Sequence, residues 1–128
     1  MWPAYYAGHS LGEYNALSSF ASIIPLETVI ELVYHRGSTM HHLIDRDERG
    51  RSNYRMGALR PNQFGVGDAD VRDYVDAVSR DSGEFLEIVN YNLKGSQYAL
   101  AGTVAGCEAL EKAVKRELER TGGKNAFI

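Results

Sequence analysis

The segment at residues 8–13, with the sequence Gly-His-Ser-Leu-Gly-Glu, constrains the fold of this chain more than any other. A short apolar run, residues 5–7, precedes it. Apolar residues follow it at helical spacing, namely Leu11, Tyr14, Leu17 and Ala21. This context predicts a strand that turns sharply into a helix, which is the setting of a Gly-x-Ser-x-Gly nucleophile elbow. We expect Gly8 and Gly12 to be glycine because larger residues would crowd such a turn.

An elbow of this kind presents the Ser10 hydroxyl beside the start of a helix, where backbone N–H groups lack partners. Ser10 is therefore a candidate nucleophile, and the N–H of Leu11 is a candidate donor to an oxyanion. The alternative is that Ser10 only caps the helix. Adjacent residues on a tight turn point apart, so we interpret His9 as a packing or hydrogen-bonding residue of the elbow.

A nucleophilic serine needs a general base, normally a histidine, within hydrogen-bond reach. His35, His41 and His42 flank the apolar stripe of the expected second helix, whereas bases of hydrolase type usually come from a late loop. We therefore expect the base to lie outside these residues. His41 and His42 lack the spacing of a zinc motif with the nearby acidic residues, so no metal site is predicted.

Composition and charge exclude several classes of protein. The chain has 128 residues and a net charge of −3, which argues against nucleic acid as a partner. No apolar run approaches the ~20 residues of a membrane span, and the first residues do not form a signal peptide. The single cysteine, Cys107, excludes an internal disulfide and fits a reducing compartment. We expect a cytoplasmic protein in which Cys107 is a buried structural thiol.

Residues 1 to about 44 are expected to form a strand and two helices, of which Pro25 opens the second. An apolar stripe follows along that helix, formed by Leu26, Val29, Ile30, Val33, Met40 and Ile44. Residues 45–52 form an exposed charged connector. An elbow strand needs neighbours on both sides, so we expect a fragment of a larger polypeptide.

From Tyr54 onward, strands and helices alternate. Strands are expected at 54–59, 85–91, 97–101 and from residue 124, with helices from about 71 and 104. Asp68 or Asp70 is expected to cap the first of these helices and Thr103 the second. This β-α-β-β-α-β order is typical of a ferredoxin-like unit. The predicted class is α/β, with α+β content in this chain, and the predicted domains are 1–52 and 53–128.

Arg36 lies within the apolar stripe of the second expected helix. A cation on such a face is costly unless an anion meets it. The anion could be Glu13 or Glu31, in a structural salt bridge. The other interpretation is that the guanidinium receives a substrate carboxylate through two hydrogen bonds. Ser10 and Arg36 together then imply a diacid substrate, acylated at one end and held at the other.

Several segments resemble the malonyl-CoA:acyl-carrier-protein acyltransferases, and specifically the malonyl/palmitoyl transferase region of type I fatty acid synthases of the bacterial or fungal giant-polypeptide kind. The segments that carry the resemblance are residues 8–14, 34–40, 45–54, 85–92 and 97–102. The resemblance covers nearly the whole chain. It implies a partial hydrolase-like subdomain in 1–52 and a ferredoxin-like subdomain in 53–128.

The resemblance also implies residue roles. Ser10 would hold the acyl group as an ester, Leu11 would supply one oxyanion N–H, and Arg36 would bind the malonyl carboxylate. His9 would support the elbow, and Asn92 would line the site from the small subdomain. The family's catalytic histidine would follow Ile128 and its oxyanion glutamine would precede Met1, so the 128 residues alone are expected to be inactive.

The resemblance further implies substrates and partners. Acyl-CoA and the phosphopantetheine thiol of an acyl-carrier protein would be the substrates, other fatty acid synthase domains the partners, and no cofactor would be bound.

Two other functions remain open. One is a serine esterase or thioesterase of the α/β-hydrolase type, which has no use for the Arg36 cation. The other is a non-catalytic ferredoxin-like binding module, which the acidic charge and the absence of an RNA-binding signature at 97–101 disfavour.

Overall fold

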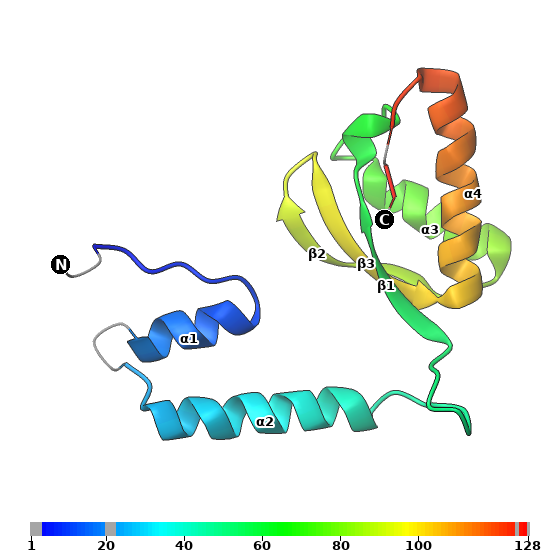
Figure 1. Cartoon of the computed structure of the whole chain (residues 1–128). Helices are drawn as coiled ribbons and strands as arrows, with labels where there is room; N and C mark the ends of the chain where they lie inside the picture. The colour runs from blue at the N-terminus through cyan, green and yellow to red at the C-terminus, as the bar shows by residue number, and fades with distance from the viewer. Residues whose placement is uncertain (1–3, 20–22, 125, 128) are drawn as a thin grey trace. The chain divides into compact units, whose positions relative to one another are not determined.

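The computed structural model of the chain describes residues 4–19, 23–124 and 126–127. The chain divides into two compact units, Met1–Asp45 and Arg46–Ile128 (Figure 1). The first unit is helical, and the second combines a sheet with two helices. Among the described residues, no helix is both long enough and apolar enough to cross a membrane.

The first unit contains α1 (Leu11–Ser19) and α2 (Leu26–His42). Pro25 opens α2 as predicted: it occupies the N-cap position, with φ of −55°, and its carbonyl accepts the N–H of Val29 at 3.0 Å. Residues 5–7 are not a strand, which corrects the sequence prediction. A strand forms by pairing with a neighbouring strand, and the strands of the described residues all belong to the sheet of the second unit.

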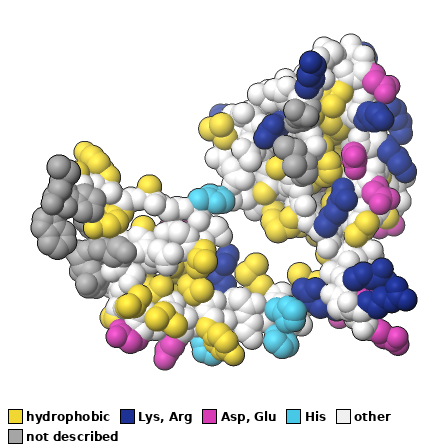
Figure 2. All heavy atoms as spheres, viewed as in Figure 1, with side chains coloured by type: hydrophobic (Ala, Val, Ile, Leu, Met, Phe, Trp, Pro, Cys, Tyr) yellow, Lys and Arg dark blue, Asp and Glu magenta, His cyan; other side chains and the backbone are white. Residues whose placement is uncertain are grey.

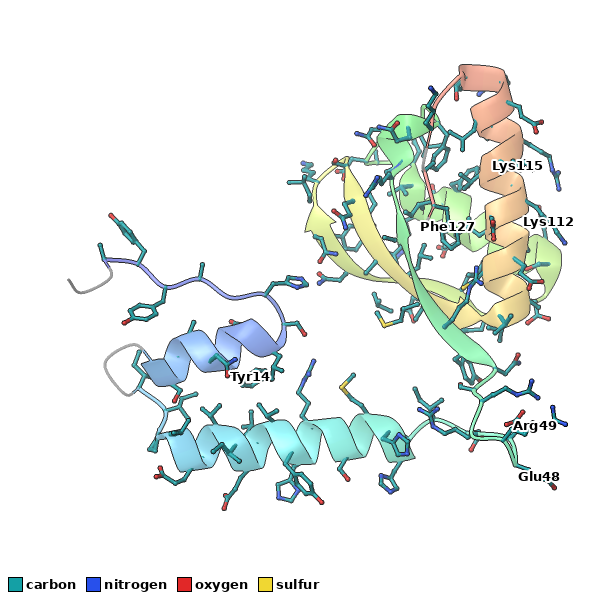
Figure 3. The ribbon with its side chains drawn as sticks, in the orientation of Figure 1. Tyr14, Glu48, Arg49, Lys112, Lys115 and Phe127 are labelled. Carbon is teal, nitrogen blue, oxygen red and sulfur yellow. The ribbon has the colours of Figure 1, made fainter. Side chains whose placement is uncertain are left out.

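The apolar stripe predicted for α2 is largely exposed. Val29 is its one buried residue among those described, whereas Leu26 and Ile30 are 61% and 60% exposed. Hydrophobic side chains are accordingly visible on the surface of the first unit (Figure 2). The physical reason is length. α1 has 9 residues and α2 has 17, about 14 Å against about 26 Å of helix, so α1 covers only part of the stripe. Tyr14 projects from α1 toward α2 (Figure 3). Ala21 lies outside the described residues.

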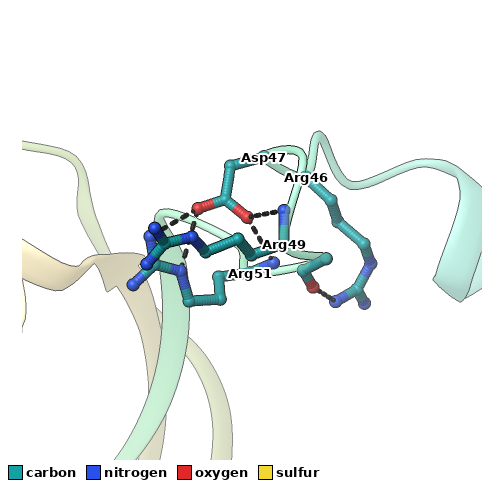
Figure 4. A network of polar contacts seen from close by, with 5 residues as sticks. Arg46, Asp47, Arg49 and Arg51 are labelled. Carbon is teal, nitrogen blue, oxygen red and sulfur yellow. Dashed lines mark hydrogen bonds and ion pairs between the residues drawn. The ribbon is translucent and has the colours of Figure 1, made fainter.

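The charged connector is exposed, as predicted, and it has an ordered turn (Figure 4). The Asp47 carboxylate accepts the backbone N–H groups of Arg49 at 2.9 Å and Arg51 at 2.8 Å, and also the Arg51 Nε–H at 2.9 Å. The backbone N–H of Arg51, with its guanidinium and the N–H of Arg49, holds the pKa of Asp47 below its ordinary value. Arg46 closes the turn by donating to the Gly50 carbonyl at 3.0 Å.

The second unit is a three-stranded antiparallel sheet with order β1-β3-β2. Its elements are β1 (Tyr54–Leu59), a short 3-10 turn (Pro61–Gln63), α3 (Val71–Ser82), β2 (Leu86–Leu93), β3 (Gln97–Thr103) and α4 (Val104–Thr121). Tyr54 pairs with Thr103 and Leu59 with Tyr98 along β1 and β3. Both helices pack on one face of this sheet (Figure 1).

The core of the second unit lies between that face and the two helices. It is formed by Leu59, Phe64, Val71, Val75, Leu86, Tyr98, Leu100, Cys107, Leu110, Val114 and Ala126. Cys107 is buried and free, as predicted. The strand expected from residue 124 is reduced, in the described residues, to one antiparallel bridge between Phe127 and Leu59, supported by the Arg60 N–H to Ala126 carbonyl bond of 2.7 Å. This bridge places Phe127 beside β1 (Figure 3).

The helix caps follow the prediction at α4 but not at α3. The Thr103 side chain accepts the N–H of Gly106 at 3.0 Å and so caps α4. Asp70 precedes α3 without capping it through its side chain. Asp68 instead accepts the hydroxyl of Tyr98 and the N–H of Gly95 at 3.1 Å. The Tyr98 hydroxyl holds the pKa of Asp68 below its ordinary value, and the contact ties the β2–β3 turn to the segment before α3.

We expect Leu110→Ala to lower the free energy of unfolding by about 2–5 kcal/mol, because Leu110 is fully buried in this core and its truncation leaves a cavity. Leu93→Ala is the matched control, since Leu93 is 59% exposed and its truncation should change the value by less than about 0.5 kcal/mol. Urea unfolding followed by circular dichroism measures both. Equal losses in the two variants would contradict this core.

Candidate active site at the elbow

The backbone of Ser10 has the conformation that a nucleophile elbow requires. Its φ is +54°, and it is the one non-glycine residue with a positive φ among those described. Left-handed backbone is strained for a serine and is maintained only where the surroundings enforce it. Two hydrogen bonds do so here: the Gly12 N–H donates to the His9 carbonyl at 3.0 Å, and the Glu13 N–H donates to the Ser10 carbonyl at 3.1 Å.

Gly8 makes the tight turn sterically feasible. A Cβ atom at position 8 would lie 2.0 Å from the Gly12 carbonyl oxygen and 2.5 Å from the Glu13 nitrogen. The chain before Ser10 therefore runs against the first turn of α1, and only glycine fits there. Gly12 was also expected to be required by crowding in the turn. That prediction is wrong, because a Cβ at Gly12 would meet nothing within 4 Å among the described residues.

The elbow presents Ser10 at the N-terminus of α1. Leu11 is the first residue of that helix, and Ser10 and His9 are both exposed. The backbone N–H groups of a first helical turn have no acceptor within the helix and carry partial positive charge. The arrangement can place an attacking hydroxyl next to donors for a developing oxyanion.

Arg36 lies on α2 and meets α1 through an aromatic ring. Its guanidinium carbon is 5.9 Å from the centre of the Tyr14 ring, a cation–π contact. Glu13 and Glu31 are both described, and neither forms an ion pair with Arg36. The salt-bridge alternative is therefore wrong for this structure. The contact of Tyr14 with Arg36 was not predicted from the sequence. The position of Tyr14 four residues after Ser10 was the available signal.

The histidines do not assemble a base or a metal site. His42 Nδ1 lies 2.8 Å from the Ser38 carbonyl oxygen, and the His41 and His42 rings pack edge to face. No histidine in the described part of the chain hydrogen-bonds to Ser10. Within the same residues, no group of three His, Cys, Asp or Glu side chains could hold a metal ion.

A mainly apolar hollow of about 510 Å³ lies behind the elbow, between the extended residues before it and α1. Its lining residues are Ala4, Tyr5, Tyr6, Ala7, Gly8, Glu13, Ala16 and Leu17. Ser10 is not among them.

Asn92 lies on β2 of the second unit and is exposed. Pairing of β2 with β3 is irregular around it: Asn90 is opposite Ala99 and Leu93 is opposite Gln97, with shifts in register before and after Asn90. Such irregularities reorient side chains on a strand.

The chain is similar in sequence and in structure to several known proteins. It is 41% identical over 107 residues to fatty acid synthase subunit beta of Schizosaccharomyces pombe, covering 82% of this chain and 5% of that protein. The Saccharomyces cerevisiae subunit is 40% identical over 109 residues, covering 84% and 5%. Among solved structures, FabD from Acinetobacter baumannii matches with a TM-score of 0.70 and 28% identity, over 100% of this chain and 35% of that one.

A second solved structure also matches the chain. It is the acyl-carrier-protein S-malonyltransferase of Burkholderia pseudomallei, with a TM-score of 0.66 and 30% identity, over 93% of this chain and 33% of that one. The chain is similar to part of the fungal fatty acid synthase beta subunits and to part of these solved malonyltransferases. The resemblance seen in the sequence is thereby confirmed, and the similarity to the beta subunits, at about 40%, relates it to the malonyltransferase region of fungal fatty acid synthases. No protein-family model matches the chain.

The chain spans about 5% of the fatty acid synthase subunits and about a third of the solved transferases. The mixed helix-and-sheet fold is therefore similar to part of the transferase fold.

We expect Gly8→Ala to open the elbow, because the new methyl group would overlap the backbone of α1. Hydrogen exchange of the Gly12 and Glu13 amides should accelerate by about tenfold or more as their bonds to His9 and Ser10 are lost. Gly12→Ala is the matched control, and its Cβ would enter open space. Nuclear magnetic resonance measures both variants, and unchanged exchange in Gly8→Ala would contradict the packing described here.

Proposed function

We propose that this chain contributes the nucleophilic serine and the carboxylate receptor of an acyltransferase in fatty acid synthesis, which moves malonyl groups from CoA to an acyl-carrier protein. The observation that carries the proposal is the left-handed backbone of Ser10 at the start of α1, with Gly8 against the helix. The relatives named above support the reaction class.

In the proposed first half-reaction, the Ser10 Oγ attacks the thioester carbonyl of malonyl-CoA. A general base takes the hydroxyl proton and later gives it to the departing CoA thiolate, and the C–S bond breaks as the serine ester forms. The N–H of Leu11 donates to the oxyanion of the tetrahedral intermediate. In the second half, the phosphopantetheine thiol of the carrier protein attacks the ester and releases Ser10.

The base and the second oxyanion donor are not supplied by the described residues around Ser10. The family resemblance implies a histidine following the small subdomain and a glutamine preceding the elbow. We infer that these groups complete the site in the full-length enzyme and that the 128 residues alone do not transfer acyl groups. The reaction as proposed uses CoA and phosphopantetheine thioesters as substrates and requires no bound cofactor.

Arg36 is the residue from which we infer the class of substrate, an acyl group with a free carboxylate. Its guanidinium has no hydrogen bond or ion pair with another described residue, so its N–H donors are available to a carboxylate. A malonyl group presents that carboxylate, whereas a long acyl chain does not. Long-chain acyl groups, of which palmitoyl is the example implied by the resemblance, form a second class of substrate that would bypass this contact.

We assign residues 1–52 to the large, hydrolase-like subdomain and residues 53–128 to a ferredoxin-like small subdomain. The order β1-α3-β2-β3-α4, with Phe127 bridged to the outer side of β1, supports the second assignment. Asn92 would line the substrate site from this subdomain. The partners would be the carrier protein and other synthase domains, in the cytoplasm.

Ser10→Ala in the full-length enzyme should abolish covalent acyl loading, because no other described side chain is placed as a nucleophile at the elbow. Intact-mass measurement after incubation with malonyl-CoA detects the ester. Leu93→Ala is the control, since Leu93 is exposed on β2 and has no role in the proposed reaction. A malonyl adduct that persists on the Ser10→Ala protein would refute the assignment.

Arg36→Ala should impair malonyl transfer far more than transfer of an uncharged acyl group. The loss of a bidentate, charge-assisted pair in a desolvated site removes on the order of 2–5 kcal/mol of transition-state stabilisation. An acyl chain without a second carboxylate loses nothing comparable. The kcat/KM values for malonyl-CoA and palmitoyl-CoA give the comparison, and equal losses would show that Arg36 is structural.

A further inference from the structure

Tyr14 is the described residue that meets the Arg36 guanidinium. The two side chains come from different helices of the first unit, α1 and α2, and lie 5.9 Å apart from guanidinium carbon to ring centre. Tyr14 is half-buried and Arg36 is exposed. No acidic side chain in the described part of the chain competes for Arg36. The ring is therefore the feature that restrains an otherwise flexible, solvated cation.

The spacing along α1 connects this contact to the elbow. Tyr14 follows Ser10 by four residues, which is about one helical turn, or ~5.4 Å along the axis. Side chains of a helix lean toward its N-terminus, which for α1 is the end that Ser10 precedes. The Tyr14 ring, and the guanidinium over it, are therefore directed toward the elbow end of α1.

A cation–π contact with a ring is compatible with binding a carboxylate. The ring attracts the charge of the guanidinium and accepts none of its N–H hydrogen bonds, while the five N–H donors of arginine lie in the guanidinium plane. A ring contact therefore leaves the two-pronged edge free, whereas a salt bridge to a glutamate would occupy it.

We propose that Tyr14 is a positioning residue that holds Arg36 over α1, with its donors available to the carboxylate of a diacid acyl group attached to Ser10. This inference rests on the proposed function, because it assumes that Arg36 receives that carboxylate. It adds the residue that orients the receptor and so makes Tyr14 a determinant of acyl specificity, although Tyr14 itself touches no reacting atom.

The test compares Tyr14→Leu, which removes the ring and keeps an apolar side chain, with Tyr14→Phe, which keeps the ring and removes the hydroxyl. In the full-length enzyme, kcat/KM is measured for malonyl-CoA and for palmitoyl-CoA. Tyr14→Leu should lower the malonyl-to-palmitoyl ratio roughly two- to fivefold, the fold-change expected for a cation–π contact of about 0.5–1 kcal/mol. Tyr14→Phe should retain the ratio.

The uncharged substrate reports on folding and on the elbow, because its transfer does not use Arg36. Equal losses for both substrates in Tyr14→Leu would overturn the inference and make Tyr14 a packing residue. If Tyr14→Leu does not fold, Tyr14→Met replaces it, and the same ratio decides. A ratio that falls in Tyr14→Phe as much as in Tyr14→Leu would also overturn it, since the hydroxyl would then be the active group.

The Arg36→Ala background separates this inference from the proposed function. If Arg36 receives the carboxylate and Tyr14 acts through it, adding Tyr14→Leu to Arg36→Ala should leave the ratio unchanged. An unchanged ratio in Arg36→Ala alone refutes the proposed receptor. A ratio that falls in Arg36→Ala but not in Tyr14→Leu refutes only the role of Tyr14.

Discussion

The close approach of Gly8 to the first turn of α1 is the constraint on which the candidate site depends. With hydrogen as its side chain, residue 8 brings the incoming chain against the Gly12 carbonyl, and the next residues must then reverse direction within one turn. Ser10 absorbs that reversal with a φ of +54°. A strained backbone at one exposed, polar residue is a feature that proteins retain where it serves function. The same turn places the serine directly before Leu11, the first residue of α1.

The second half of the site depends on the packing of α2 against α1. α1 is shorter than α2 and covers only part of it, so most of the apolar stripe of α2 remains exposed in this structure. The contact between Tyr14 and Arg36 lies within that surface. A nucleophile and a cation on neighbouring helices are what transfer of a diacid acyl group requires, and this pairing distinguishes the proposed acyltransferase from a serine esterase that shares the elbow.

Local patterns predicted much of this structure. Pro25 at the start of α2, Thr103 at the cap of α4 and the strand Tyr54–Leu59 follow from short-range stereochemistry, and all are observed. The predictions that were wrong depend on distant partners. Residues 5–7 need a neighbouring strand, and Asp68 bonds to Tyr98, thirty positions later, instead of capping α3. The partner of Arg36 was likewise not predicted, because helix packing decides whether a cation meets a glutamate or a ring.

A crystal structure of the full-length enzyme trapped with malonyl-CoA is the most direct measurement of the central claim, that the elbow serine and the arginine of α2 hold the two ends of one acyl group. The account predicts an ester at the Ser10 Oγ, a carbonyl oxygen directed at the Leu11 N–H, and the free carboxylate on the guanidinium of Arg36. An acyl group on any other residue, or a carboxylate held away from Arg36, would contradict it.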